Sequence, residues 1–293
     1  MKIRMFLPVM LIAYLLACCI SCAKEEGNTT PEERLPFTDT VTFSVSPVRL
    51  NLFEKTDYAI YKKDKNGDRI NITYNLMTQL DSLIWDTPEV FYDVCNIDKM
   101  IVSREQSYYL PGTYKTVISL YRDSSMILTE SVEVTVELVG DFLGIDWEED
   151  ALLSNRYNYV SNVKNFTLGL SYIQDEVAPL ALLGYWINNY NGREEHLAQL
   201  ASIRPFFYDY ITLLYGKSAF LYEGDDLSQS PLHTEYEKRF SYPLEELFPD
   251  ISYFPLAIWD TDSSHIILIG SLPGDPGVLE ISNYYVLAEP RKF

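Results

Sequence analysis

The feature that most constrains this chain is a strict alternation of apolar and polar residues in the segment between residues 41 and 139. Apolar side chains occupy every second position of VTFSV at 41–45 and of VEVTVEL at 132–138. Successive side chains of a β-strand point to opposite faces, so this alternation predicts strands with one buried face. Because no long helical period occurs before residue 140, the segment is expected to be all-β.

Turn signals divide the same segment into strands. Asn66-Gly67 lies between strand-like stretches at 58–62 and 69–76 and predicts a hairpin, because both central positions of such a turn favour positive φ. Gly112-Thr113 is expected to open a strand at 114–122. Ile84-Trp85 is expected to lie in a central strand.

Three of these pieces resemble the Ig-like sandwiches of the PKD type. They are the apolar-Trp pair Ile84-Trp85, the entry LPGTY at 110–114 into a late strand, and the valine-rich strand that ends near Val139. The resemblance implies a β-sandwich domain over residues 41–139 with the tryptophan in its core. The chain departs from the family after the Trp-Asp pair, where residues 86–89, DTPE, replace a glycine-rich turn.

From residue 140 onward, strand and helix signals are mixed, which predicts an α+β domain over residues 140–293. Asp146 is expected to cap a short helix with an acidic first turn. A longer helix is expected to begin at Pro205 and to end at Gly216. A short helix is expected at 243–248, and strands are expected at 166–173, 180–188, 196–203, 233–240, 254–260, 266–271 and 284–288.

Motifs of this second half resemble a C-terminal α+β module of Bacteroidota lipoproteins of unknown function. They are FLGIDW at 142–147, LLYGK at 213–217, and IWDT at 258–261 followed by IILIG at 266–270. The resemblance implies no catalytic residues. No catalytic residue is therefore assigned.

The N-terminus resembles a bacterial lipoprotein signal, with Lys2 and Arg4 before an apolar stretch at 6–17 and cysteines at 18 and 22. LLAC at 15–18 matches the usual lipobox, whereas CAKEE at 22–26 resembles the export tag of surface lipoproteins in Bacteroidota. We expect a signal peptide at 1–21, lipidation of Cys22 and a flexible tether at 22–40, with Cys18 and an ordinary secretory signal as the alternatives. The resemblance implies a lipid-anchored protein of the outer membrane, exposed at the cell surface.

The net charge and the numbers of cysteines and histidines limit which partners, disulfides and metal sites are expected. The net charge of −19 disfavours nucleic acids and anionic headgroups, so the membrane contact is expected through the lipid anchor. Cys95 alone lies beyond the signal region, which leaves no intramolecular disulfide and predicts a structural thiol. The three histidines are at least 32 residues apart, so neither a metal site nor a cofactor is expected.

Catalytic signatures are weak in this sequence. Serine nucleophile elbows, P-loops and dinucleotide-binding glycine runs do not occur. Adjacent carboxylates occur at 148–149, 194–195 and 245–246, but adjacent residues rarely face each other across a sugar, and a solvated or helix-start role is expected.

The chain contains 23 tyrosines, and one aromatic group stands beside amides. Tyr185, Trp186 and Tyr190 alternate with Asn188, Asn189 and Asn191, a composition suited to stacking on sugar rings. The alternative is that these aromatics are ordinary residues of a half-buried sheet. We expect a non-catalytic binding or assembly role, directed at an extracellular glycan or protein. A carboxylate-dependent extracellular hydrolase and a purely structural envelope protein remain as alternatives.

Overall fold

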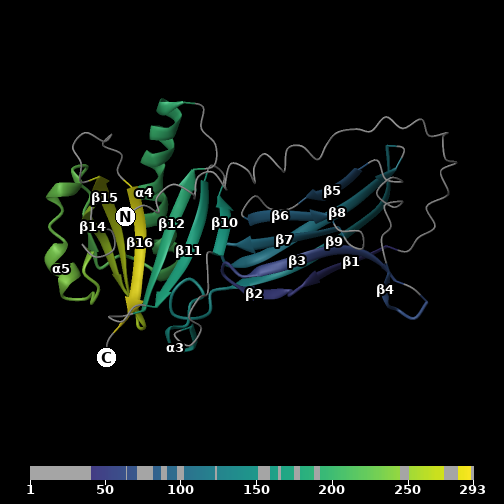
Figure 1. Cartoon of the computed structure of the whole chain (residues 1–293), viewed down its shortest axis with the longest axis horizontal. Helices are drawn as coiled ribbons and strands as arrows, with labels where there is room; N and C mark the ends of the chain where they lie inside the picture. The colour runs from purple at the N-terminus through teal and green to yellow at the C-terminus, as the bar shows by residue number, and fades with distance from the viewer. Residues whose placement is uncertain are drawn as a thin grey trace, which may run out of the picture. The chain divides into compact units, whose positions relative to one another are not determined.

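The computed structural model describes residues 41–291 except 64, 71–81, 87–90, 98–101, 123, 151–158, 164–165, 175–178, 188–191, 245–250 and 274–282. The expected signal peptide, Cys22 and the tether lie outside the described residues. Asp39–Phe293 forms one compact unit. Its described part is β-rich and contains three sheets (Figure 1).

The first sheet has the strand order β1-β3-β7-β6, with β4 paired to β3. Its strands are β1 (Val41–Ser46), β3 (Lys55–Lys63), β4 (Arg69–Ile70), β6 (Phe91–Ile97) and β7 (Val102–Tyr108). The predicted hairpin is confirmed, since Lys63 pairs with Arg69 and Gly67 between them has φ of 88°.

The second sheet has the strand order β2-β9-β8-β5. Its strands are β2 (Arg49–Asn51), β5 (Ser82–Asp86), β8 (Gly112–Arg122) and β9 (Ser125–Glu137). The alternation predicted for β9 is confirmed, because Val134 and Val136 are buried while Glu133 and Glu137 are exposed. The central position predicted for the Trp85 strand is wrong: β5 stands at the end of the order, because strand order depends on long-range pairing that local alternation does not encode.

A tyrosine-rich interior joins these two sheets. The ring of Tyr108 on β7 stacks on Tyr114 on β8 with centroids 4.2 Å apart. The hydroxyls of Tyr58 and Tyr108 lie 2.7 Å apart and are buried. Burying phenols is favourable only when their hydroxyls are hydrogen-bonded, and this pairing satisfies that requirement.

The third sheet is antiparallel and has seven strands in the order β10-β11-β12-β16-β15-β14-β13. They are β10 (Tyr159–Val163), β11 (Phe166–Gln174), β12 (Pro179–Ile187), β13 (Phe220–Leu221), β14 (Ile251–Asp260), β15 (Ser264–Pro273) and β16 (Asn283–Pro290). The strands predicted at 254–260, 266–271 and 284–288 are confirmed as parts of β14, β15 and β16.

Both faces of this third sheet are apolar, and each packs against a helix. Within β15, Ile266 and Leu268 belong to one buried cluster, while Ile267 and Ile269 belong to another. The first cluster contains residues of α4 (Arg193–Tyr215), and the second contains Tyr236 of α5 (His233–Glu237). The run IILI is continuous in sequence because both faces of its strand are covered. We call the side that packs against α5 the α5 face.

The strand predicted at 196–203 is wrong, because these residues belong to α4, and the helix does not begin at Pro205. Leu200, Ile203 and Phe207 are buried at helical spacing on both sides of the proline. A proline removes one backbone hydrogen bond from a helix, and burial of this apolar stripe outweighs that loss. The predicted end is confirmed, since the Gly216 N–H donates to the Thr212 carbonyl.

The strand predicted at 233–240 is also wrong, because His233–Glu237 forms helix α5. Two pairs at i, i+4 spacing carry the helical signal: Tyr236 stacks on Phe240 at 4.7 Å, and Arg239 pairs with Glu235 at 2.6 Å. Of the helix predicted at 243–248, residues 245–248 lie outside the described residues.

The segment between the second and third sheets is held by side-chain caps and a shared core. Asp146 accepts from the Glu148 N–H at 2.9 Å and so caps α3 (Trp147–Asp150) as predicted. The Asn51 side chain donates to the Val139 and Gly144 carbonyls. One apolar cluster runs from Tyr58 in the first sheet to Phe207 in α4, so the three sheets pack as one body.

Candidate functional site

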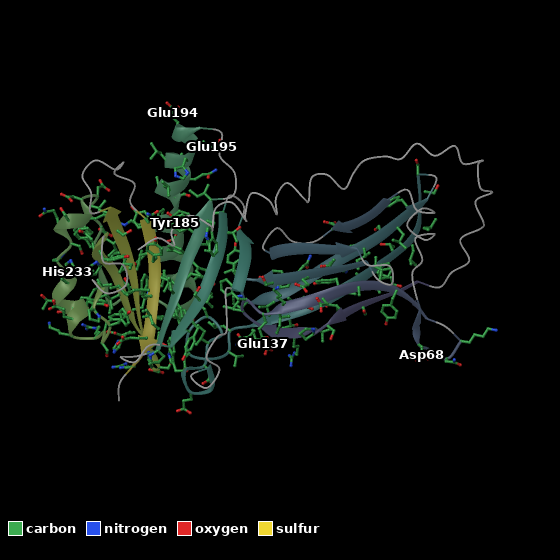
Figure 2. The ribbon with its side chains drawn as sticks, viewed as in Figure 1. Asp68, Glu137, Tyr185, Glu194, Glu195 and His233 are labelled. Carbon is green, nitrogen blue, oxygen red and sulfur yellow. The ribbon has the colours of Figure 1, made fainter. Side chains whose placement is uncertain are left out.

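The predicted aromatic group divides between the two faces of β12. Tyr185, which is labelled in Figure 2, lies with its ring centroid 6.4 Å from that of Phe166 and 6.0 Å from that of Phe207, on the α4 side. Its hydroxyl donates to Asn283 at 3.3 Å, and burial raises its pKa. Trp186 follows Tyr185 in the strand and therefore points to the α5 face. Tyr190 lies outside the described residues.

Trp186 is 53% exposed although it lies in a seven-stranded sheet. Its ring lies directly over Gly169 of the neighbouring strand β11. A Cβ atom at Gly169 would stand 2.2 Å from both Cη2 and Cζ3 of the indole, closer than any side chain permits. The indole can therefore occupy this position only because residue 169 is a glycine.

Gly184 pairs directly with Gly169 across the two strands. A Cβ at Gly184 would stand 3.8 Å from Cδ1 of Tyr285 on β16, an ordinary contact distance. Trp186 and Tyr285 therefore flank a pair of glycines, which leave the backbone between the two rings uncovered. We call Trp186, Tyr285 and Gly169 the aromatic platform.

The described positions around the aromatic platform are uncharged. On β11, the register places Thr167 opposite Trp186 and Ser171 opposite Leu182, and directly opposed residues share a face. On β16, the Asn283 side chain accepts from the Tyr185 hydroxyl and is therefore engaged on the α4 side. Among the described residues at this end of the α5 face, the polar groups are hydroxyls.

A cavity of about 260 Å³ lies beside α5, at another part of this face. Its walls come from one continuous segment, residues His233, Tyr236, Glu237, Phe240, Ser241, Tyr242, Pro243 and Leu244. The Tyr236 hydroxyl donates to the Tyr242 carbonyl, which closes the segment on itself. The cavity is therefore formed by α5 and the turn after it, without side chains from other parts of the described chain.

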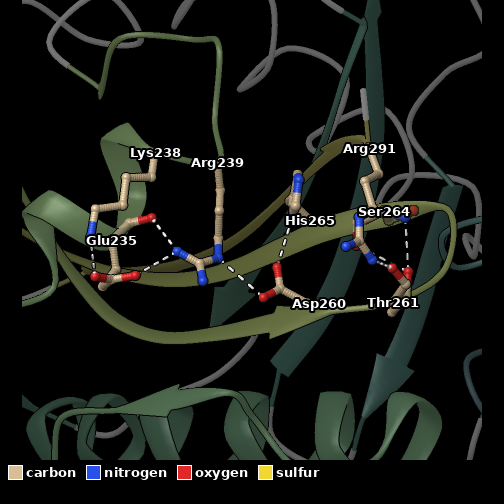
Figure 3. A network of polar contacts seen from close by, with 8 residues as sticks. All are labelled: Glu235, Lys238, Arg239, Asp260, Thr261, Ser264, His265 and Arg291. Carbon is tan, nitrogen blue, oxygen red and sulfur yellow. Dashed lines mark hydrogen bonds and ion pairs between the residues drawn. The ribbon is translucent and has the colours of Figure 1, made fainter. Parts of the chain in front are cut away.

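A chain of ion pairs fixes α5 to the sheet next to that cavity (Figure 3). Glu235 accepts from Lys238 Nζ and Arg239 Nη1, each at 2.6 Å. Arg239 Nε donates to Asp260 Oδ2 at 3.1 Å, and His265 Nδ1 lies 2.7 Å from Asp260 Oδ1. Burial raises the pKa of Asp260, but the hydrogen bonds from His265 and Arg239 outweigh it and leave the pKa below its usual value.

Three titratable residues stand side by side on neighbouring strands at this point. Asp260 pairs with His265, and His265 pairs with Glu289. Glu289 is 0% exposed, and both of its carboxylate oxygens accept from the Ser241 N–H, at 2.8 and 2.9 Å. Through this hydrogen bond from Ser241, the row of Asp260, His265 and Glu289 anchors the turn that follows α5 to the sheet. The spacing of Asp260 and His265 across a tight turn was the signal that sequence reasoning overlooked.

The remaining candidates from the sequence do not gather in one place. Glu194 and Glu195 are exposed in the first turn of α4, which confirms their helix-start role (Figure 2). Glu245 and Glu246 lie outside the described residues, as does the side chain of Cys95. Within the described part of the chain, no three His, Cys, Asp or Glu residues are arranged to hold a metal ion.

Comparisons with known proteins leave the family open. No protein-family model and no curated protein matches the chain. Among solved structures, domains 5–6 of the S-layer protein SbsC align with 86% of this chain and 85% of that chain, at 11% identity and a TM-score of 0.24. Domains 4–9 of the surface layer protein SbsC align with 86% of this chain and 27% of that chain, at 12% identity and a TM-score of 0.23. At such scores the alignments do not establish a shared fold.

Proposed function

We propose that this protein is a lipid-anchored cell-surface protein with a non-catalytic binding role. In this proposal the third sheet recognises an extracellular partner, a glycan or a protein, through the aromatic platform. The N-terminal sequence supports the anchor, and the composition of the described α5 face supports recognition. No helix within the described ranges combines the length and hydropathy needed to cross a membrane.

The observation that carries the binding role is the exposure of Trp186. A large aromatic ring that stays 53% exposed on a rigid sheet is unusual for a side chain whose task is only packing. Exposed Trp and Tyr side chains provide contact area at little entropic cost, which is why recognition surfaces use them. Because β12 is an inner strand of the sheet, the indole is held on a stable base.

We further propose that the first two sheets are an Ig-like sandwich of the PKD type and that residues 140–293 are an α+β domain. The stacking of Tyr108 in the first sheet on Tyr114 in the second sheet supports the sandwich. The helices on both faces of the third sheet support the α+β assignment.

The binding role is tested with a soluble chain of residues 23–293, which contains the whole compact unit Asp39–Phe293. It is applied to a glycan array and to a pull-down of secreted and surface proteins, beside the variants Trp186→Ala and Leu213→Ala. Leu213 is 69% exposed on α4 and controls for loss of exposed apolar area elsewhere. We expect saturable binding that Trp186→Ala abolishes and Leu213→Ala leaves intact. Equal binding by all three chains, or none by any, contradicts the proposal.

The anchor is tested separately by metabolic labelling with an alkyne fatty acid in a Gram-negative host. Cys22→Ser should abolish labelling of the membrane fraction, whereas Cys18→Ser should retain it. The opposite pattern would assign the lipid to Cys18. Absence of label in the unmodified chain would contradict lipid anchoring.

A further inference from the structure

The indole of Trp186 lies over the backbone of Gly169 on the neighbouring strand. Its carbons Cη2 and Cζ3 lie 2.2 Å from the place that a Gly169 Cβ would occupy, whereas Cε3 lies 3.4 Å from it, so one edge of the ring rests on bare backbone. The side chain remains 53% exposed in that position. The exposed part of the ring is therefore available to a ligand. A flat, exposed π surface favours stacking with a flat or ring-shaped group.

The polar surroundings argue against a charged ligand. Thr167 and Ser171 are the described polar neighbours on this face, and neither carries a charge. A charged group placed over the indole would find no counter-ion in these two residues, and an anion would meet a chain of net charge −19. Hydroxyl groups suit a neutral ligand with many hydroxyls.

The size of the exposed apolar surface argues against a protein partner. Trp186 is the exposed large apolar residue that this end of the α5 face offers among the described residues. A stable protein interface buries about 800 Å² on each partner and has an apolar centre of several residues. One indole beside a glycine pair is closer in scale to a single ring.

We propose that the aromatic platform binds a neutral carbohydrate whose sugar ring stacks on the exposed indole of Trp186. The inference rests on the proposed binding role and names its ligand class. The axial C–H groups of a pyranose form an apolar patch that covers the indole, while its equatorial hydroxyls point away from the ring. Because the described neighbours offer no cation and the chain has a net charge of −19, uronic-acid and sulfated glycans are not the expected class.

The glycine pair provides a sharp test, because Gly169→Ala and Gly184→Ala make the same chemical change at directly opposed positions. Neither glycine has a left-handed φ, so alanine suits both backbones. A methyl at 169 must displace the indole, since its nearest contact would be 2.2 Å, whereas a methyl at 184 meets its nearest atom at 3.8 Å. Gly169→Ala therefore retains the Trp186 side chain but moves its indole ring away from this position.

The measurement is binding of residues 23–293 to an array of neutral oligosaccharides built from hexoses, pentoses and N-acetylhexosamines, with polygalacturonate and heparin as anionic probes. Isothermal titration follows for each sugar that binds. We expect Trp186→Ala and Gly169→Ala to weaken binding at least tenfold and Gly184→Ala to change it less than threefold. Near-ultraviolet circular dichroism and thermal unfolding confirm that each variant is folded. Should Gly169→Ala fail to fold, Trp186→Ala and Trp186→Phe decide, with partial retention expected for phenylalanine.

Three results would overturn the carbohydrate proposal. They are the absence of binding to any neutral sugar, a preference for the anionic probes, and neutral-sugar binding that is equal in all variants. The binding role itself survives the first result if a purified protein partner binds the native chain and Trp186→Ala abolishes that complex. The two proposals therefore fail separately.

Discussion

The hydroxyl of Tyr210 on α4 donates a hydrogen bond of 2.7 Å to the backbone carbonyl of Tyr109, 101 residues earlier in the chain. Tyr210 is 3% exposed, and burial raises its pKa well above the usual value. The bond satisfies a carbonyl that burial would otherwise leave without a partner. It also joins the third sheet's helix to the segment that follows β7.

Replacement of Tyr210 by Phe is expected to lower the free energy of unfolding by about 1–3 kcal/mol, because the carbonyl loses its buried donor. Urea denaturation followed by circular dichroism measures the loss. Tyr208→Phe is the control on the same helix, because the Tyr208 hydroxyl lies 3.4 Å from Ser218 Oγ in a part-buried site. A loss no larger than that of the control would show that the Tyr210 bond contributes little.

Asp260 is expected to make stability depend on acidity. Its pKa in the folded protein lies below the usual 3.8, so the folded state binds fewer protons than the unfolded state in acid. Its contribution is complete above the unfolded pKa and is lost as the pH falls through the folded pKa. Asp260→Asn should therefore lower stability at pH 7 and flatten the decline below about pH 4.

The measurement for Asp260 is the urea midpoint between pH 7 and pH 2.5. Glu130→Gln, an exposed carboxylate on β9, serves as the reference for removing one negative charge. If both variants shift the curve by the same amount at every pH, the hydrogen bonds of Asp260 with Arg239 and His265 are not the cause.

Gly140 is expected to tolerate no side chain. Its φ is 99°, and a Cβ there would stand 2.7 Å from the Ile145 carbonyl oxygen, which accepts the N–H groups of Asp141 and Phe142. Gly140→Ala should cost more than the roughly 1–2 kcal/mol of a left-handed backbone alone. Gly67→Ala isolates that backbone term, because Gly67 has φ of 88° with nothing within 4 Å. Equal midpoints for the two variants in thermal unfolding would contradict the steric part.

Two residues of α4 test which side of the helix packs on the sheet. Phe207 is 0% exposed and Leu213 is 69% exposed. Phe207→Ala should destabilise the protein by about 3–5 kcal/mol through lost burial and a cavity. Leu213→Ala should stay within about 0.5 kcal/mol. Chemical denaturation of both variants checks the difference, and a large effect of Leu213→Ala would indicate that its surface is covered in solution.

Alternation in the sequence predicted most strands because a half-buried strand carries its own period, as β9 does in Val134 and Val136. The prediction is wrong for α4, because a proline is typical of a helix start whereas here Leu200 and Ile203 continue the buried helical stripe before Pro205. It also failed for α5, where the i, i+4 pair Glu235 and Arg239 was the stronger signal.

The candidate site was predictable only in part. Alternation separates Tyr185 from Trp186 without any coordinates, since neighbours in a strand face opposite sides. That Gly169 lies under Trp186 depends on the register between β11 and β12, which is a long-range property. The row of Asp260, His265 and Glu289 likewise needs three strands in register before it exists.

The single apolar cluster that reaches from Tyr58 in the first sheet to Phe207 in α4 has a consequence for modularity. Heat should melt this body in one calorimetric transition, with the van't Hoff enthalpy equal to the measured enthalpy. A chimaera spliced between residues 139 and 140 would inherit half of a core and an uncovered apolar face. Recombination within this gene is therefore expected to preserve residues 41–291 as one inherited block.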